Sequence, residues 1–194
     1  MFVKKCLAIV LFLAYSAVSA AAQDDEGLAI ETAPPDSAAS AQLPRSFRGL
    51  SLGMGLEELK AALKSDTAFV FRGDRDVSFL PNSNQNLVDS AGSDFIKRAF
   101  FQIKDDVVFV MTFELNTEKI DHYSVFTAFS NKYGGPLLID PKQSEWEDGE
   151  TRVYIERPLT VKYIDKNIFD SVVAESKLSE SSAVLQRQEF INDF

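Results

Sequence analysis

Few side chains in this sequence could carry out catalysis, and they are dispersed. The chain has one histidine and one cysteine among its 194 residues, so a zinc site built from several His and Cys ligands is excluded by number. A Ser-His or Cys-His pair would have to use His122, and no neighbouring motif marks a nucleophile for it. We therefore interpret His122 as a residue at the edge of the core.

Three groups of acidic residues are the next candidates: Asp74/Asp76, Asp105/Asp106 and Glu145/Glu147/Asp148/Glu150. None has the alternating oxygens, central glycine and distal glutamate of a calcium loop. Two carboxylates facing each other across a cleft could hydrolyse a glycosidic bond, but acids in turns and on a strand surface explain these positions as well. The sequence therefore assigns no catalytic, cofactor-binding or metal-binding residue, and it predicts no cofactor.

Arg72-Gly73-Asp74 is the tripeptide that mediates cell adhesion when it stands at the tip of an exposed loop. Here it lies between two short β-like runs, so we interpret it as a hairpin turn with charged flanks. A phosphate-binding glycine loop is also absent, because Gly53 and Gly55 lack a third glycine and a strong preceding strand.

The composition is that of a folded globular protein, with 45% hydrophobic and 25% charged residues. Acidic residues outnumber basic ones by 29 to 20, which gives a formal net charge of −9. Nucleic-acid binding depends on basic residues that neutralise phosphates, so the charge balance predicts that nucleic acid is not a partner.

The first 22 residues have the layout of a secretory signal peptide. Lys4 and Lys5 precede an uncharged apolar run over 7–18, and small residues follow, which predicts cleavage after Ala20 or Ala22. Cys6 precedes the apolar run, so the pattern does not predict a lipoprotein. An uncleaved membrane anchor is the alternative, although the run is short for a bilayer span. No later segment is long and apolar enough, so we expect a soluble periplasmic or secreted protein.

Residues 23–45 form an acidic stretch rich in Ala, Pro and Ser, which predicts a disordered tether. The folded domain is expected over 46–190. The expected helices are 56–63, 117–133 and a C-terminal helix from about 167 to 190. The expected strands are 68–71, 77–80, 95–103, 107–115, a short run at 137–139, and 144–147, 152–156 and 160–164. Residues 81–93 are expected to be a long polar loop.

These patterns predict one α+β domain, an antiparallel sheet packed by two to three helices. Strand 107–115 is expected to be central, with Val107, Phe109, Met111, Phe113 and Leu115 on one face. The order of a helix followed by strands occurs twice, at about 54–115 and 117–165, so two tandem units of this kind are an open alternative.

The segment Leu52-Gly53-Met54-Gly55-Leu56-Glu57-Glu58-Leu59 resembles the opening helix motif of small exported envelope proteins, including the SmpA/OmlA-type outer-membrane assembly lipoproteins. In that family the helix ends in Gly-x-Pro and strands with a tryptophan follow; here Gly134-Gly135-Pro136 and Trp146 match, but on the second helix. The resemblance covers about 49–63 and 131–147, and it lacks the lipidated cysteine. It implies a periplasmic, non-enzymatic module that binds protein.

Three functions follow from the sequence. The leading hypothesis is a non-enzymatic envelope protein that binds another envelope protein, through the 81–93 loop or the C-terminal Phe194. The second is a binder of a small molecule or lipid, with an aromatic pocket between sheet and helix. The third is a carboxylate-based hydrolase.

Overall fold

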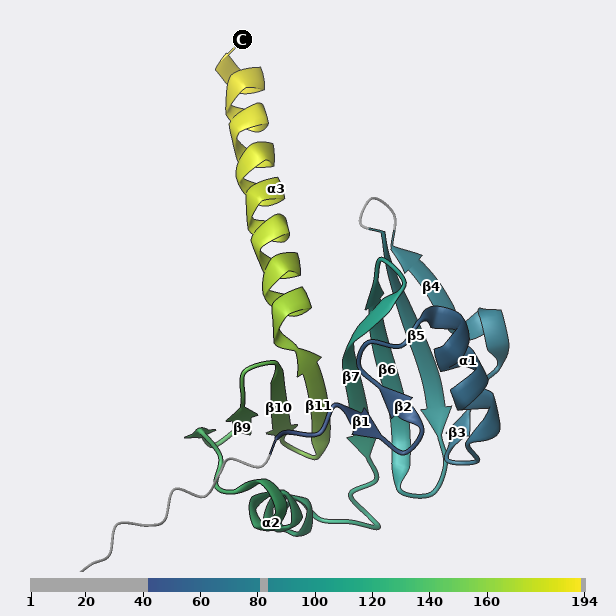
Figure 1. Ribbon diagram of the computed structural model, residues 1–194. Helices are drawn as coiled ribbons and strands as arrows, with labels where there is room; N and C mark the ends of the chain where they lie inside the picture. The colour runs from purple at the N-terminus through teal and green to yellow at the C-terminus, as the bar shows by residue number, and fades with distance from the viewer. Residues whose placement is uncertain (1–41, 81–83, 193–194) are drawn as a thin grey trace, which may run out of the picture. The chain divides into compact units, whose positions relative to one another are not determined.

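The computed structural model describes residues 42–80 and 84–192, which form an α+β fold (Figure 1). The predicted signal peptide, the tether up to residue 41 and Phe194 lie outside the described residues. The helices are α1 (Leu56–Ser65), α2 (His122–Tyr133) and α3 (Lys166–Asn192), with a 3-10 turn at Gly73–Asp76. The strands are β1 (Ser46–Phe47), β2 (Leu50–Ser51), β3 (Phe69–Val70), β4 (Val77–Leu80), β5 (Gln85–Gly92), β6 (Ile96–Lys104), β7 (Val107–Leu115), β8 (Leu138–Ile139), β9 (Gln143–Glu147), β10 (Thr151–Glu156) and β11 (Thr160–Asp165).

Nine of the described strands form one sheet in the order β3-β5-β6-β7-β11-β10-β9-β8, with β4 paired to β5 beside β3. Every pairing between described strands is antiparallel. The expected α+β fold with an antiparallel sheet is therefore confirmed. A helix followed by a meander of strands occurs in each half, and the last strands of the two meanders, β7 and β11, pair at the centre.

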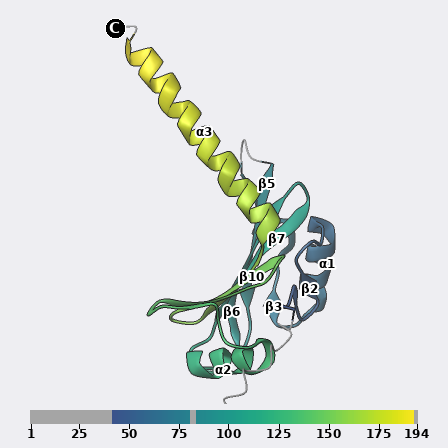
Figure 2. The ribbon, with the colours of Figure 1, turned by 60° about the vertical axis from the view of Figure 1, so that its left-hand side comes forward.

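The two faces of the sheet carry different layers. The β1–β2 arm, α1 and α2 cover one face, where Leu59 and Leu63 of α1 join Phe101, Met111 and Phe113 in the main core. A smaller cluster on the other face joins Phe109, Val110 and Ile164 to the first turns of α3. Figure 2 shows α1 and α2 beside the sheet, and Figure 1 shows α3 continuing from the end of β11.

The beginning of α1 follows from its sequence. Gly55 is the N-cap, and its N–H donates to Oε2 of Glu58 over 3.2 Å. Glu57 and Glu58 in the first turn and Lys64 in the last turn complement the helix dipole. The predicted amphipathic helix is thereby confirmed, with Leu59 and Leu63 on its buried side.

The expected start of α2 at residue 117 is wrong, because the helix begins at His122. Residues 117–120 instead form a turn in which Oδ1 of Asn116 accepts the N–H of Glu118 over 3.1 Å. Asp121 then caps the helix by accepting the N–H of Ser124 over 2.9 Å. The predicted end is confirmed, since Gly134 adopts a φ of 85° and closes the helix.

Part of the polar loop expected at 81–93 is in fact strand β5. Its backbone pairs with β6 along its whole length and with β3 and β4 on the other side. Val88 and Ser90 are fully buried within it. Tertiary pairing thus overrides the weak strand propensity of a sequence rich in Asn, Asp, Ser and Gly. The short strands β1 and β2 were not predicted either.

Strand β7 is central and largely buried, as expected, but its side chains do not alternate as predicted. The register shifts between Gln102 and Ile103, so that Val110 faces Gln102 while Val108 faces Ile103. Phe109 therefore lies with Val110 and Ile164 in the cluster beneath α3, and Val108 joins the main core. The bulge shifts the alternation of side chains by one residue, so that even-numbered residues face the main core before it and odd-numbered residues after it.

Only the first turns of α3 are packed on the sheet. Ile168, Phe169 and Val172 are partly buried there, whereas every described residue from Ala174 onward is exposed. Lys104 reaches across to Glu175 over 2.5 Å. None of the described helices carries an apolar stretch long enough to cross a bilayer.

Candidate ligand-binding site

An apolar pocket opens on the helix-covered face, between the sheet, the β1 end and α2. Its volume is about 450 Å³. The strands β6, β7 and β11 form its floor, with Ile96, Phe113, Leu115, Val161 and Tyr163. The walls come from the β1 loop, the turn after α1, the β5–β6 turn and the segment that contains α2: Phe47, Arg48, Thr67, Ala68, Ser93, Asp94, Phe95, Ile120, Ser124, Val125, Ala128 and Phe129.

The pocket forms because two elements, β1 and α2, cover different parts of the same face of the sheet. Phe47 of β1 packs on Phe113, with ring centroids 4.6 Å apart. On the other side of the pocket, the rings of Phe126 and Phe129 of α2 lie 5.7 and 5.6 Å from Trp146, measured between ring centroids, and Phe129 also lines the pocket. Trp146 also anchors the end of α2, because its Nε1–H donates to the Gly134 carbonyl over 2.9 Å. The pocket lies between these two groups of contacts.

Aromatic rings line the inner part of this pocket. Tyr163 lies 6.0 Å from Phe113 and 6.4 Å from Phe129, measured between ring centroids. Edge and tilted contacts of this kind stabilise an aromatic cluster beyond the burial of its area. The cavity wall is therefore rigid and apolar, which suits an apolar ligand.

Each charged side chain that lines the pocket is paired with an oppositely charged side chain that is not part of the lining. Arg48 donates to both carboxylate oxygens of Asp66, over 2.6 and 2.9 Å. These hydrogen bonds from the guanidinium lower the pKa of Asp66 below its ordinary value. Asp94 forms an ion pair with Lys119. The charges at the pocket are thus already neutralised within the protein.

His122 does not line this pocket. It lines a smaller cavity of about 250 Å³ with Arg157, Ser144 and Asp140. Its Nε2 atom is buried without a hydrogen-bond partner, and burial, then the charge of Arg157, lowers the pKa of the imidazole. Among the described residues no hydrogen bond joins the His122 ring to a serine hydroxyl, so the structure assembles no nucleophile pair around it.

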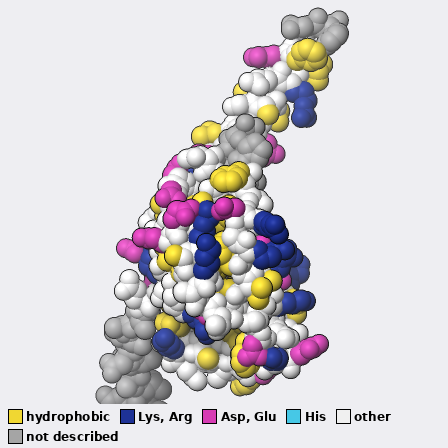
Figure 3. Space-filling model, turned by 90° about the vertical axis from the view of Figure 1, so that its right-hand side faces the viewer, with side chains coloured by type: hydrophobic (Ala, Val, Ile, Leu, Met, Phe, Trp, Pro, Cys, Tyr) yellow, Lys and Arg dark blue, Asp and Glu magenta, His cyan; other side chains and the backbone are white. Residues whose placement is uncertain are grey.

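The adhesion tripeptide lies in the 3-10 turn rather than in a hairpin turn, so that expectation is wrong in its detail. Arg72 is 2.5 Å from Oδ1 of Asp76, and Asp74 is 2.9 Å from Nζ of Lys60. Both charged members of the tripeptide are therefore engaged within the protein. Figure 3 views the side that bears α1 and shows basic and acidic side chains intermingled there.

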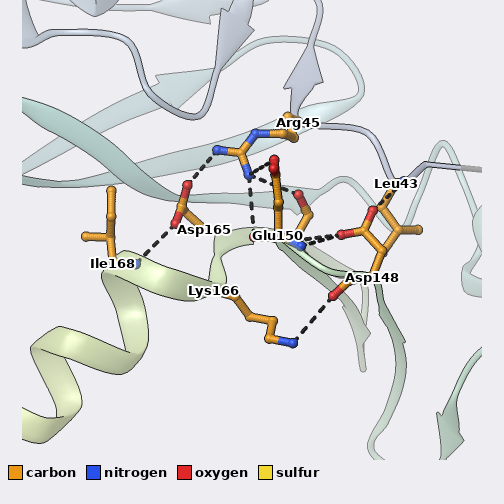
Figure 4. Close-up of polar contacts among 8 residues, drawn as sticks. Leu43, Arg45, Asp148, Glu150, Asp165, Lys166 and Ile168 are labelled. Carbon is orange, nitrogen blue, oxygen red and sulfur yellow. Dashed lines mark hydrogen bonds and ion pairs between the residues drawn. The ribbon is translucent and has the colours of Figure 1, made fainter.

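The acidic group at 145–150 serves the junction between the N-terminal segment, the β9–β10 turn and α3 (Figure 4). Asp148 accepts the N–H groups of Leu43, Glu150 and Thr151 over 2.7 to 2.9 Å. Although burial opposes its ionisation, these hydrogen bonds hold the pKa of Asp148 below its ordinary value. Glu147 is paired with Lys166 at 2.7 Å and with Arg152 at 2.6 Å.

The other acids have similar structural roles. Asp106 accepts the N–H of Leu56 at the start of α1 over 2.9 Å, and Asp105 accepts a hydrogen bond from Asn84. No group of three or more His, Cys, Asp or Glu side chains suited to a metal ion occurs within 42–80 and 84–192. The structure thus does not bring the sequence candidates together, and none of the acidic candidates or His122 lines the larger pocket.

Comparison with known proteins identifies one family. Residues 45–175 match the TP0088 domain, about two thirds of the chain, and this range includes every residue that lines the pocket. No curated protein and no solved structure matches the chain. The comparisons give no support to the resemblance to SmpA/OmlA-type lipoproteins suggested by the Gly53-Met54 motif. The chain belongs to the TP0088 domain family.

Proposed function

We propose that this protein binds one apolar small molecule in the pocket between the sheet and α2. The observation that carries the proposal is a cavity of about 450 Å³ where a closely packed core would otherwise lie. Ligand pockets in proteins have volumes of roughly 300–1,000 Å³ and mostly apolar linings with few polar groups. Protein interiors otherwise leave few voids larger than a water molecule.

The size and lining of the pocket favour a single hydrocarbon chain or a molecule of similar bulk. Burial is worth roughly 0.8 kcal/mol for each methylene group, so a chain of about ten carbons gains about 8 kcal/mol. That gain is comparable with the cost of association, about 4–15 kcal/mol. With a cost at the low end of this range, the net gain is about 4 kcal/mol, which corresponds to a dissociation constant of about 1 mM.

The test is to fill the pocket from its exposed side. Ala128 lines the pocket and is exposed on α2, so Ala128→Trp places an indole over the cavity without burying a polar group. Asn131→Trp is the matched control, because Asn131 is exposed on the same helix and is not part of the lining. Binding is measured by the fluorescence increase of the neutral apolar probe N-phenyl-1-naphthylamine.

We expect Ala128→Trp to weaken probe binding at least roughly tenfold, because loss of one or two buried side-chain contacts costs about 1.4 kcal/mol or more. Asn131→Trp should bind the probe as the unsubstituted protein does. Equal binding by all three proteins would show that the probe does not use this pocket and would contradict the proposal.

The proposal includes export to the periplasm or beyond, which the basic start, apolar run and small residues of 1–22 support. The expected mature chain begins at Ala21 or Gln23. Fractionation of cells, followed by mass measurement of the intact protein, tests this. Recovery from the cytosol with Met1 retained would contradict it.

A second candidate function, binding to another envelope protein, is favoured by exposed apolar side chains outside the pocket. Leu137, Leu138 and Ile139 are 72%, 49% and 64% exposed at the β8 edge of the sheet, and Leu185 is 65% exposed on α3. An apolar strand at a sheet edge and an unpacked helix are common docking elements. Crosslinking in intact envelope tests whether the β8 edge binds a partner, by comparing the unsubstituted chain with a Leu138→Ser/Ile139→Lys variant. If both proteins form the same crosslinked species equally well, the β8 edge is not the binding surface.

A further inference from the structure

The side chain of Tyr163 is the polar exception within the apolar floor of the pocket. It projects from β11 onto the helix-covered face and is only 4% exposed. Its hydroxyl makes no hydrogen bond to another described residue. Among the described residues, the fully buried side-chain atoms without a partner are His122 Nε2 and Ser130 Oγ. The Tyr163 oxygen is not one of them, and Tyr163 belongs to the lining of the pocket, so a ligand in the pocket lies beside a side chain that carries a hydroxyl.

A buried hydroxyl without a protein partner is costly unless something else supplies the hydrogen bond. Burial, and then the nearby Tyr133, raise the pKa of Tyr163, so the phenol stays protonated at any physiological pH. It can therefore donate its hydrogen to a ligand. A group that accepts a hydrogen bond, such as a carbonyl oxygen, is its natural complement.

The paired charges at the pocket favour a ligand whose polar group is uncharged. Arg48 is held by Asp66 and Lys119 by Asp94, so neither cation at the pocket is available to neutralise a carboxylate. An unpaired ion in an apolar pocket would lose far more hydration than one phenol hydrogen bond returns. A neutral ester, ketone or amide carries the acceptor at much smaller cost.

We propose that the ligand is an uncharged acyl compound, a hydrocarbon chain with one carbonyl group, and that the Tyr163 hydroxyl donates a hydrogen bond to that carbonyl. This inference rests on the proposed function, because it needs the pocket to bind a ligand. It adds the chemical class of the ligand and the residue that selects it.

Displacement of N-phenyl-1-naphthylamine by three compounds of similar chain length tests the proposal. They are methyl decanoate, undecane and sodium decanoate, each measured with the unsubstituted protein, Tyr163→Phe and Tyr133→Phe. Tyr163→Phe removes only the hydroxyl and keeps the ring contacts with Phe113 and Phe129. Tyr133→Phe is the control, since Tyr133 lies near Tyr163 but is not part of the lining. Thermal unfolding checks that each variant is folded.

We expect methyl decanoate to displace the probe better than undecane or decanoate does. Tyr163→Phe should weaken methyl decanoate roughly 3- to 10-fold, the effect of one neutral hydrogen bond, and leave undecane unchanged. Tyr133→Phe should change neither. A purely structural role for Tyr163 would weaken both compounds alike, and that result would overturn the inference.

The outcomes separate the inference from the function on which it rests. If the compounds bind and Tyr163→Phe has no selective effect, or if decanoate binds best, the ligand class is wrong while the pocket stands. If the unsubstituted protein binds neither methyl decanoate nor undecane, and Ala128→Trp does not affect the probe, both the inference and the proposed function are overturned.

Discussion

The carboxylate of Asp76, one member of the candidate acidic group Asp74/Asp76, has a structural role. Asp76 is 4% exposed, and it accepts hydrogen bonds from the backbone and the guanidinium of Arg72. Although burial opposes its ionisation, these bonds keep the pKa of Asp76 below its ordinary value. Asp74, two residues earlier, has a side chain that is 90% exposed.

Asp76→Asn is therefore expected to lower the free energy of unfolding by about 2 kcal/mol, the value of hydrogen bonds to a charged group. Asp74→Asn, which removes only a surface ion pair with Lys60, should leave the free energy of unfolding almost unchanged. Because the folded pKa of Asp76 is depressed, its contribution is present above about pH 4 and is lost as the pH falls through the folded pKa. Urea unfolding at pH 7 and pH 3 measures both effects; equal costs for the two variants would contradict this assignment.

His122 should make stability depend on pH in a higher range. Burial and Arg157 lower its pKa in the folded state, so the unfolded chain takes up a proton first as the pH falls below about 6.5. Folding stability should therefore decline as the pH falls below about 6.5, and the decline should end once the pH passes the lowered pKa of the folded state. His122→Gln should show a flatter unfolding temperature across this range. The same slope in both proteins would mean that another group causes it.

The residues of the pocket could not be identified from the sequence. Phe47, Phe113, Phe129 and Tyr163 all stand at apolar positions of their elements, and this pattern is the same for a filled core and for an open cavity. The difference depends on where two covering elements meet the sheet, which involves residues more than 100 positions apart. The sequence raised an aromatic pocket between sheet and helix as one hypothesis, and the structure adds which residues line a space there.

At the scale of elements, the junction of β11 and α3 is built around Asp165. One oxygen of its carboxylate accepts the N–H of Ile168, which caps the helix, over 3.1 Å. The other is 2.5 Å from Nη2 of Arg45, in the segment that enters the fold 120 residues earlier. One side chain thus fixes both the start of α3 and the N-terminal segment.

Two substitutions separate these roles. Asp165→Asn keeps an oxygen for the N-cap and removes the ion pair, so we expect a cost of about 1 kcal/mol. Asp165→Ala removes both and leaves Arg45 without its main partner, so about 2–3 kcal/mol is expected. Chemical denaturation with the helix signal in circular dichroism measures the difference. If both variants lose the same stability, the cap contributes nothing.

Elements with strong local signals were predicted well, and elements defined by distant partners were not. The hairpin of β6 and β7 and the end of α2 at Gly134 follow from alternation and from glycine and proline chemistry. Strand β5 is polar, and its strand conformation comes from pairing on both sides. The bulge that turns Phe109 to the α3 side has no signal in the sequence of β7 alone.

At the scale of the fold, the two meanders share one sheet and one main core. The central ladder pairs β7 of the first with β11 of the second, from Val110 to Glu114 and from Thr160 to Ile164. Phe113 packs on Phe101 of the first half and on Tyr163 of the second. We therefore expect the two halves to unfold together, in one transition.

The fluorescence of Trp146, the single tryptophan, reports on the second half, whereas far-ultraviolet circular dichroism reports on both. The two signals should give the same midpoint in urea within experimental error. An early transition in the tryptophan signal alone would show that the halves are separate folding units, as independent tandem domains would be.

The central position of β7 and β11 also determines when this chain can fold. Strand β7 is complete at Leu115, but its neighbour β11 ends only at Asp165, 50 residues later. Until then the edge of β7, with Val110, Met111 and Phe113, is unpaired and able to join a strand from another molecule. A chain released early, or stalled before residue 160, should therefore aggregate rather than keep a stable first half.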